Sequence, residues 1–167
     1  MDRPRGLRKS LITAAVLYIF DAFIINQGAI ALITILVVVI VLLPRAIFSI
    51  KDKPLFKNRL LKATIYFIMA VAIFGSNFIN NKIAKYRAER LIEACYKYHN
   101  KYQQYPNKLE DLVPDFIPRV PSAKFTLSFN RFKYISSDKH HMLMYVHLPP
   151  FGRPFYDFEK GKWGYSD

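Results

Sequence analysis

The stretch from Leu60 to Tyr105 constrains the fold of this chain more than any other, because it contains no proline and a single glycine, Gly75. Its first part, Leu60–Ile79, is predominantly apolar, and about 20 such residues are enough to cross the hydrocarbon core of a bilayer. Its second part is amphipathic and ends before Pro106, since a residue that precedes proline disfavours the α conformation. The sequence therefore predicts one long helix that spans a membrane first and enters water afterwards.

A second apolar run, Ser10–Leu43, is interrupted by Asp21 and by Asn26-Gln27-Gly28. It is longer than one span requires, and basic clusters flank it on both sides. Because Lys and Arg favour the cytoplasmic side, both ends of the run should lie on that side, which requires an even number of crossings. We expect a helical hairpin with spans at residues 7–26 and 29–48 and a tight turn at Gln27-Gly28. One tilted helix is the alternative.

The formal net charge of +13 also carries topological information. Most cationic residues of the first half directly flank apolar runs: Arg3, Arg5, Arg8 and Lys9, then Arg45, Lys51, Lys53, Lys57, Arg59 and Lys62. Membrane lipid explains this placement, and no groove-reading or RNA-binding motif accompanies the charge, so no nucleic-acid partner is expected. The third span, residues 60–79, then leads outward. We expect the N-terminus in the cytoplasm and the C-terminal domain on the outer side of the membrane.

The composition changes near Asn80, which predicts a membrane anchor at residues 1–81 and a soluble domain at residues 82–167. The start of the soluble domain carries apolar and small residues spaced alternately four and three apart, as on one face of a helix that packs on a core. These residues are Ala84, Ala88, Leu91, Cys95, Tyr98 and Tyr102. Cys95 lies on this stripe and is therefore interpreted as a small buried hydrophobic residue.

Beyond Pro106 the sequence predicts a short helix and then a sheet. Asn107 is the expected N-cap, with Glu110 in capping-box position, and Val113–Pro121 is an extended connector. After Ser122 the apolar period changes to two, which is typical of strands. The expected strands contain Phe125, Leu127 and Phe129, residues 132–135, residues 141–148 and a closing hairpin at residues 155–165. The predicted fold is an α-helical membrane anchor of three spans that continues into a small α+β domain, in which a long helix packs on an antiparallel meander of three or four strands.

The segment Arg87–Pro121 (RAERLIEACYKYHNKYQQYPNKLEDLVPDFIPRVP) resembles the start of the soluble domain of type IV pilins and type II secretion pseudopilins. In that family a long helix ends in a Tyr-Pro step, followed by a Leu-x-x-Leu segment and an extended stretch with prolines. The resemblance implies a protein of the bacterial inner (cytoplasmic) membrane, with the N-terminus in the cytoplasm and a pilin-like periplasmic domain that binds other proteins. Pilins, however, have one N-terminal span with a leader cut after Gly and Glu at the fifth mature position. Here Gly6, Gly28 and Gly75 are followed at that position by Leu11, Ile33 and Asn80, so pilin-like processing and polymerisation are not expected.

No catalytic residue, metal site or cofactor is predicted, since the sequence lacks the common nucleophile, zinc and nucleotide-binding motifs. The four histidines are His99, His140, His141 and His147. His141 and His147 are too far apart on a strand to bind one metal, and His99 with Cys95 makes only two ligands. Asp21 is the intramembrane polar residue: it is either a proton- or ion-coupling group or a carboxylate satisfied near the outer interface.

Aromatic residues are more suggestive of function than the histidines. The candidate interaction residues are Tyr98, Phe151, Arg153, Phe155, Tyr156, Trp163 and Tyr165. Tyr, Trp and Arg are enriched at protein interfaces, although the same aromatics are also consistent with a small aromatic core. We expect a non-enzymatic protein that acts through protein partners in the periplasm, as an accessory of a pilus or secretion assembly. The alternatives are an immunity protein that neutralises a periplasm-acting toxin and, third, a membrane enzyme that uses Asp21 or the His140-His141 turn.

Overall fold

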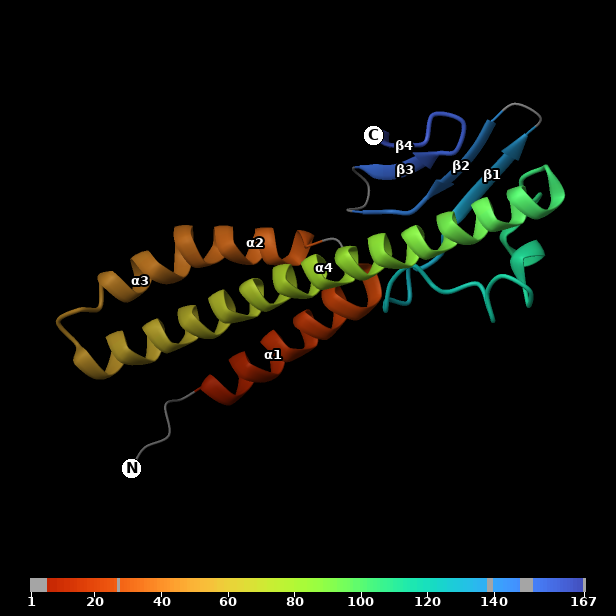
Figure 1. Cartoon of the computed structure of the whole chain (residues 1–167). Coiled ribbons are helices and arrows are strands. Elements are labelled where there is room, and N and C mark those ends of the chain that lie inside the picture. Colours follow the sequence, from red (N-terminus) through yellow and green to blue (C-terminus); the bar gives the residue numbers. More distant parts are fainter. Residues whose placement is uncertain (1–5, 27, 138–139, 148–151, 167) are drawn as a thin grey trace. The chain divides into compact units, whose positions relative to one another are not determined.

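The computed structural model describes residues 6–26, 28–137, 140–147 and 152–166. The chain divides into two compact units, Met1–Phe78 and Ile79–Asp167, and each is described by itself. Helix α4 (Lys53–Tyr102) contributes its first half to one unit and its second half to the other (Figure 1). Several predicted positions lie outside the described residues: Arg3 and Arg5 of the first basic cluster, the turn residue Gln27, the last residue of the predicted strand at 141–148, and the interaction residue Phe151.

The first unit contains two helical segments before α4, and both have a π-helical part. The elements are α1 (Leu7–Ile19), η1 (Phe20–Ile25), α2 (Ala29–Val37), η2 (Val38–Leu42) and α3 (Leu43–Ile47). Asn26 and Gly28, at the break between the two segments, both have positive φ angles. The predicted helical hairpin is therefore present, and the alternative of one tilted helix is excluded.

Two helices in the described part of the chain are long and apolar enough to cross a membrane by length and composition. One is the run Ala29–Ile47, and the other is α4, which contains the predicted span at residues 60–79. The predicted span at residues 7–26 is helical, but its α-helical part, Leu7–Ile19, has only 13 residues. Length and composition thus support the second and third predicted spans as candidates for crossing a membrane. They do not support the first predicted span.

The first unit buries small residues and exposes large apolar ones. Its core is Ala14, Ala31, Met69, Ala70 and Ile73, contributed by α1, α2 and α4. Large side chains point away from this core, among them Val16 (59% exposed), Ile33 (62%), Ile40 (67%) and Ile68 (61%). Small residues at the contact let helix backbones approach closely.

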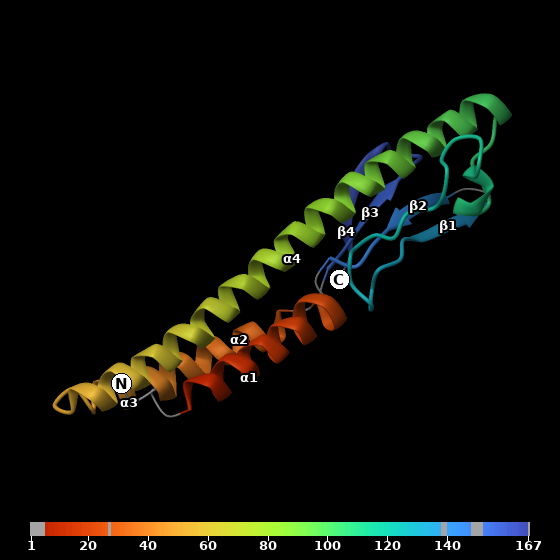
Figure 2. The ribbon, with the colours of Figure 1, turned by 90° about the horizontal axis from the view of Figure 1, so that it is seen from below.

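The second unit is a four-stranded antiparallel sheet packed on the second half of α4 (Figure 2). The strands are β1 (Lys133–Ser137), β2 (His140–Met144), β3 (Arg153–Asp157) and β4 (Lys162–Ser166), in the order β1-β2-β3-β4. This confirms the predicted meander on a long helix. Gly161, with a φ of +60°, lies in the turn of the closing hairpin, where a left-handed conformation suits glycine.

One face of the sheet meets the predicted helix stripe. Register pairs Tyr134 with Leu143, Leu143 with Tyr156, and Tyr156 with Trp163, so the four side chains form a row across the sheet. All four belong to the core, together with Ala84, Ala88, Leu91 and Cys95 from α4. The prediction of this stripe is correct except at Tyr102, which is 44% exposed because it is the last residue of the helix.

Two predicted details near the end of α4 are wrong. The helix ends at Tyr102 and not at Tyr105, because Gln103 adopts a left-handed conformation with a φ of +59°. The following helical turn is a 3-10 helix, η3 (Leu109–Leu112). Its first residues are capped by Asp111, whose Oδ2 accepts hydrogen bonds from the backbone N–H groups of Asn107 (3.0 Å) and Lys108 (3.1 Å). The predicted cap by Asn107 and Glu110 is not formed, because the short turn places Asp111 at the position that reaches back.

The predicted strand with Phe125, Leu127 and Phe129 is also wrong. No strand is assigned between Ser122 and Asn130; the segment folds back on itself, and the N–H of Ala123 donates to the carbonyl of Asn130 at 2.6 Å. Phe129 has a φ of +55°, which is incompatible with an extended strand. The alternation is real but reversed in sense: the three apolar side chains are exposed, whereas Thr126 is buried.

Candidate functional site

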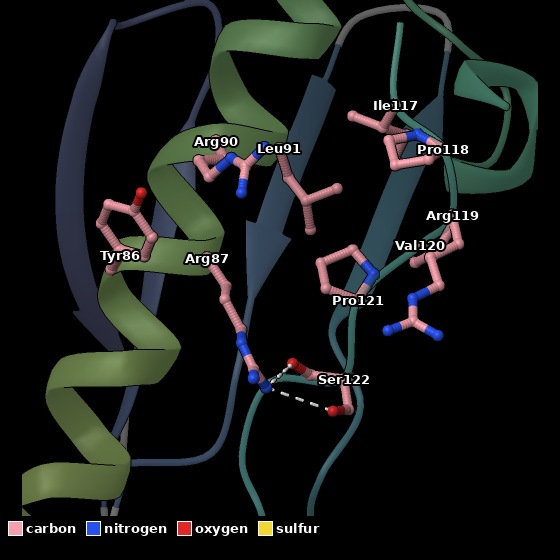
Figure 3. A pocket seen from close by; sticks show the side chains of 10 residues that line it. All are labelled: Tyr86, Arg87, Arg90, Leu91, Ile117, Pro118, Arg119, Val120, Pro121 and Ser122. Atoms are coloured by element: carbon pink, nitrogen blue, oxygen red, sulfur yellow. Dashed lines mark hydrogen bonds between the residues drawn. The ribbon is translucent and has the colours of Figure 1, made fainter. Parts of the chain in front are cut away.

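A groove of about 490 Å³ lies between the second half of α4 and the extended connector of the second unit (Figure 3). The helix contributes Tyr86, Arg87, Arg90 and Leu91, and the connector contributes Ile117, Pro118, Arg119, Val120, Pro121 and Ser122. Leu91 and Ile117 are buried core residues, so they form an apolar floor. The groove thus combines an apolar floor with three guanidinium groups.

Arg87 fixes one end of the groove. Its Nη1 donates to the backbone oxygen of Ser122 at 2.8 Å and to the Oγ of the same residue at 3.2 Å, as the dashed lines in Figure 3 show. Its guanidinium also lies over the ring of Phe125, 4.3 Å from the centroid, where a cation is attracted by the aromatic face. These contacts connect α4 to the end of the connector and to the segment that follows it.

Arg90 and Arg119 lie on opposite walls, and both are exposed. Among the residues that the structure describes, neither takes part in an ion pair, and none of the ten lining residues is acidic. A guanidinium presents several N–H donors in a plane and binds a carboxylate or phosphate through two parallel hydrogen bonds. The groove is therefore suited to an anionic group accompanied by an apolar side chain.

The sequence did not single out this groove. Arg87 and Arg90 are three residues apart on one helix and thus share a face, which is a detectable pattern. Arg119, however, lies in a connector with prolines at 118 and 121, and only the fold brings it opposite the helix. Residue spacing in the sequence could therefore have indicated only the part of the groove that α4 contributes.

The predicted interaction residues are distributed between the core and the surface. Tyr98, Tyr156 and Trp163 pack against the core, and Tyr156 also shares a hydrogen bond of 3.1 Å with the hydroxyl of Tyr96. Phe155 is half-buried, and its ring lies over Gly164, where an added Cβ would come within 2.4 Å of the ring. Arg153 and Tyr165 are exposed, and Tyr165 is 59% accessible. The structure thus does not gather these residues into one exposed patch.

Lys124 is a buried cation that the sequence gave no reason to select. It is 1% exposed, and its Nζ donates to the backbone oxygen of His147 at 2.8 Å. Burial lowers the pKa of Lys124 to about 8, because a charged amine loses its hydration inside the protein. Burial, together with the nearby Lys124, also lowers the pKa of His147. The two groups anchor the segment after Ser122 to the end of the sheet.

Asp21 has a defined local role in the first unit. It is 1% exposed, and its carboxylate accepts hydrogen bonds from the backbone N–H groups of Gly28 (2.9 Å) and Ile30 (3.1 Å) at the start of α2. Free N–H groups and the helix dipole make this end favourable for a negative charge. Gly28 is tightly placed, since an added Cβ would lie 3.2 Å from Asn77 and 3.3 Å from Phe74. Asp21 therefore closes the turn between the first two helices.

Cys95, His99 and His141 are engaged in packing or in contacts with neighbouring side chains. Cys95 is fully buried, and burial raises the pKa of its thiol to about 12, which disfavours the reactive thiolate. His141 Nδ1 lies 2.7 Å from Glu159 Oε1, and the ring of His99 lies against that of Tyr105. In the described residues, no group of three or more His, Cys, Asp or Glu side chains is placed to bind a metal ion.

Comparisons with protein families, with curated proteins and with solved structures give no significant match to this chain. The likeness to pilins is therefore one of arrangement: a long helix packed against a four-stranded antiparallel sheet. Function has to be argued from the groove and from the surfaces of the two units.

Proposed function

We propose that this protein is anchored in a membrane by its first unit and binds another protein through its second unit. The anchoring is supported by the distribution of apolar residues in the first unit. Small residues such as Ala31 and Ala70 are completely buried between the helices, whereas Ile33 and Ile68 are more than half exposed. Lipid is the solvent in which this arrangement is favourable, because it accepts large apolar side chains at the surface.

The direction of insertion follows from charge. Basic residues lie before α1 and again between α3 and the apolar part of α4, so both regions belong on the cytoplasmic side. The second unit then lies on the opposite side, which in a bacterial inner membrane is the periplasm. Lys82, Lys85, Arg87 and Arg90 lie on that outer side and work against this orientation, but the six basic residues at positions 45–62 outnumber these four.

The groove is the observation that carries the binding function. Arg90 and Arg119 face it from two sides without an ion pair in the described residues, and Leu91 and Ile117 provide an apolar floor. The partner that fits is a protein segment that contributes a carboxylate and an apolar side chain. Residues 82–167 carry an excess of basic over acidic residues, so the whole unit attracts an acidic partner.

Two kinds of partner agree with this chemistry. The pilin-like arrangement of helix and sheet favours an accessory of a pilus or secretion assembly. The basic surface favours the second candidate, an immunity protein that captures an acidic toxin in the periplasm. In both cases the protein acts by binding and not by catalysis.

The test is photocrosslinking in cells from the groove and from a matched surface position. A photoreactive residue replaces Tyr86, which is 62% exposed at the groove, or Tyr165, which is 59% exposed on β4. We expect one major crosslinked protein from position 86 and none from position 165. The double charge reversal Arg90→Glu with Arg119→Glu should remove the product. Mass spectrometry of the product then distinguishes a pilus or secretion component from a toxin.

Two outcomes of this experiment would contradict the proposal. A product from position 165 alone would place the interface on the outer hairpin and not in the groove. A product from position 86 that survives the charge reversal would show that the arginines do not select the partner.

A further inference from the structure

The segment from Ser122 to Asn130 forms a closed loop with apolar side chains on its outside. The backbone bond from Ala123 to Asn130 closes it at 2.6 Å. Phe125, Leu127 and Phe129 are 61%, 77% and 46% exposed, respectively. Three large apolar side chains on one short loop are costly in water, so this surface calls for a partner.

Polar contacts fix the loop so that the apolar side chains remain outside. The buried amine of Lys124 donates to the backbone oxygen of His147 at 2.8 Å. The hydroxyl of Thr126 donates to the backbone oxygen of Ser128 at 2.8 Å, and Arg87 packs over one face of the Phe125 ring. The loop therefore buries Lys124 and Thr126 and exposes its three large apolar side chains, which is the opposite of the pattern expected for a loop in water.

The loop is also held beside the beginning of the second unit. The backbone N–H of Phe125 donates to Oδ1 of Asn80 at 3.3 Å. Asn80 directly follows Ile79, the last residue of the apolar stretch in α4, and Ile79 is itself 58% exposed. The apolar loop thus lies next to the point where the long helix leaves its apolar stretch.

We propose that the loop at residues 122–130 inserts Phe125, Leu127 and Phe129 into the outer interface of the lipid bilayer. This inference rests on the proposed membrane anchoring of α4. Lipid is favoured over a protein partner because the loop is bonded to the residue that follows the apolar stretch, so the helix itself brings the loop to the bilayer surface. Aromatic and aliphatic side chains that enter 5–10 Å into this boundary are typical of membrane-surface elements.

Site-specific fluorescence in vesicles tests this proposal on the full chain. Single cysteines replace Leu127, Ile68 or Lys108 in a Cys95→Ala background, each is labelled with an environment-sensitive fluorophore, and the proteins are reconstituted in vesicles of phosphatidylethanolamine and phosphatidylglycerol. Ile68 reports on the proposed span, and Lys108 is an exposed polar position outside the loop. Nitroxide lipids and a water-soluble nickel chelate are the two quenchers.

We expect the label at position 127 to be quenched by shallow nitroxide lipids at least threefold more strongly than the label at position 108. Adding Phe125→Ser and Phe129→Ser to the position-127 variant should reduce this quenching by half or more.

The outcomes separate the two proposals. If position 68 is quenched by lipid and position 127 behaves like position 108, the loop proposal fails while the anchoring stands. If position 68 is open to the aqueous quencher, the anchoring itself fails, and the loop proposal with it. If position 127 is shielded from both quenchers, protein covers the loop and lipid does not, which also overturns the inference.

Discussion

The two units of this chain differ in the side chains that they place at the surface. The first packs alanines, Met69 and Ile73 between its helices and turns many large apolar side chains outward, among them Val16, Ile33 and Ile40. The second buries Leu143, Tyr145 and Phe158 and places its lysines and arginines largely on the surface, with the buried Lys124 as an exception. One continuous helix, α4, takes part in both patterns, so the difference does not come from secondary structure. Under the proposed anchoring, the same helix would meet lipid along its first half and water along its second half.

The largest expected effect comes from removing a core side chain of the second unit. Leu143 is completely buried, and Leu143→Ala should lower the free energy of unfolding by about 2–5 kcal/mol. Urea denaturation in detergent, followed by the fluorescence of Trp163, measures it. The matched change in the first unit is Ile40→Ala, at a position that is 67% exposed, and it should alter stability by less than about 0.5 kcal/mol. Equal effects at both positions would break the comparison.

The second largest loss of stability is expected when a small residue between the helices of the first unit is enlarged. Ala70 is completely buried, and Ala70→Leu should cost about 1–3 kcal/mol because the helices have to separate. Its neighbour Val71 is 53% exposed, and Val71→Leu is the control, with almost no cost. Loss of helical signal during titration with a denaturing detergent measures both variants. If Ala70→Leu leaves the midpoint unchanged, close packing is not what holds the first unit together.

The turn bonded by Asp21 should contribute less. Asp21→Ala removes the acceptor for two backbone N–H groups at the start of α2 and should cost about 0.5–2 kcal/mol, as for the loss of a helix cap. Asp21→Asn retains one acceptor oxygen but places an NH2 donor against the second N–H group, so it should recover only part of this loss. The same detergent titration applies. If Asn fails to rescue and a transport or pH phenotype appears instead, the carboxylate has a role in ion coupling.

The smallest effect is a pH dependence specific to the second unit. The pKa of Lys124 is lowered to about 8 in the folded protein, so between pH 8 and its ordinary value the unfolded chain binds more protons and stability rises with pH. Relative to the Lys124→Met variant, the free energy of unfolding of the wild-type protein should rise by about 1 kcal/mol between pH 7 and pH 9. Cys95 and the buried tyrosines titrate in both proteins and cancel in the difference. Urea denaturation at the two pH values measures this gain, and parallel curves would show that the amine is hydrated.

The sequence predicted the long helix and its stripe because both are periodic. Ala84, Ala88, Leu91 and Cys95 recur at helical spacing, and the core that they form needs no information beyond that spacing. The helix end was missed by three residues, since a left-handed Gln103 is not encoded by composition. The loop at residues 122–130 was mistaken for a strand because its apolar residues alternate with polar ones. This alternation is the same whether the apolar side chains face a core or the surface.

The groove could not be predicted in full for a different reason. Arg87 and Arg90 are neighbours on the helix, but Arg119 and the apolar floor residue Ile117 come from a connector whose path depends on tertiary packing. The same holds for Lys124, which sequence patterns place on the surface as they do most lysines. Its burial follows from the position of His147, whose backbone oxygen accepts its hydrogen bond from 23 residues away.

The bonds between Asp21 and the start of α2 also bear on how the chain enters a bilayer. A carboxylate on an isolated helix would have to be carried into lipid alone, at a cost of about 2.5–3.5 kcal/mol on insertion scales. Here both acceptor oxygens are engaged by backbone groups only seven and nine residues away. Under the proposed anchoring, the first two helices would therefore enter the membrane with the Asp21 carboxylate already bonded within their own turn. The cost of burying this acidic side chain in lipid would then fall on the hairpin as a unit and not on a single helix.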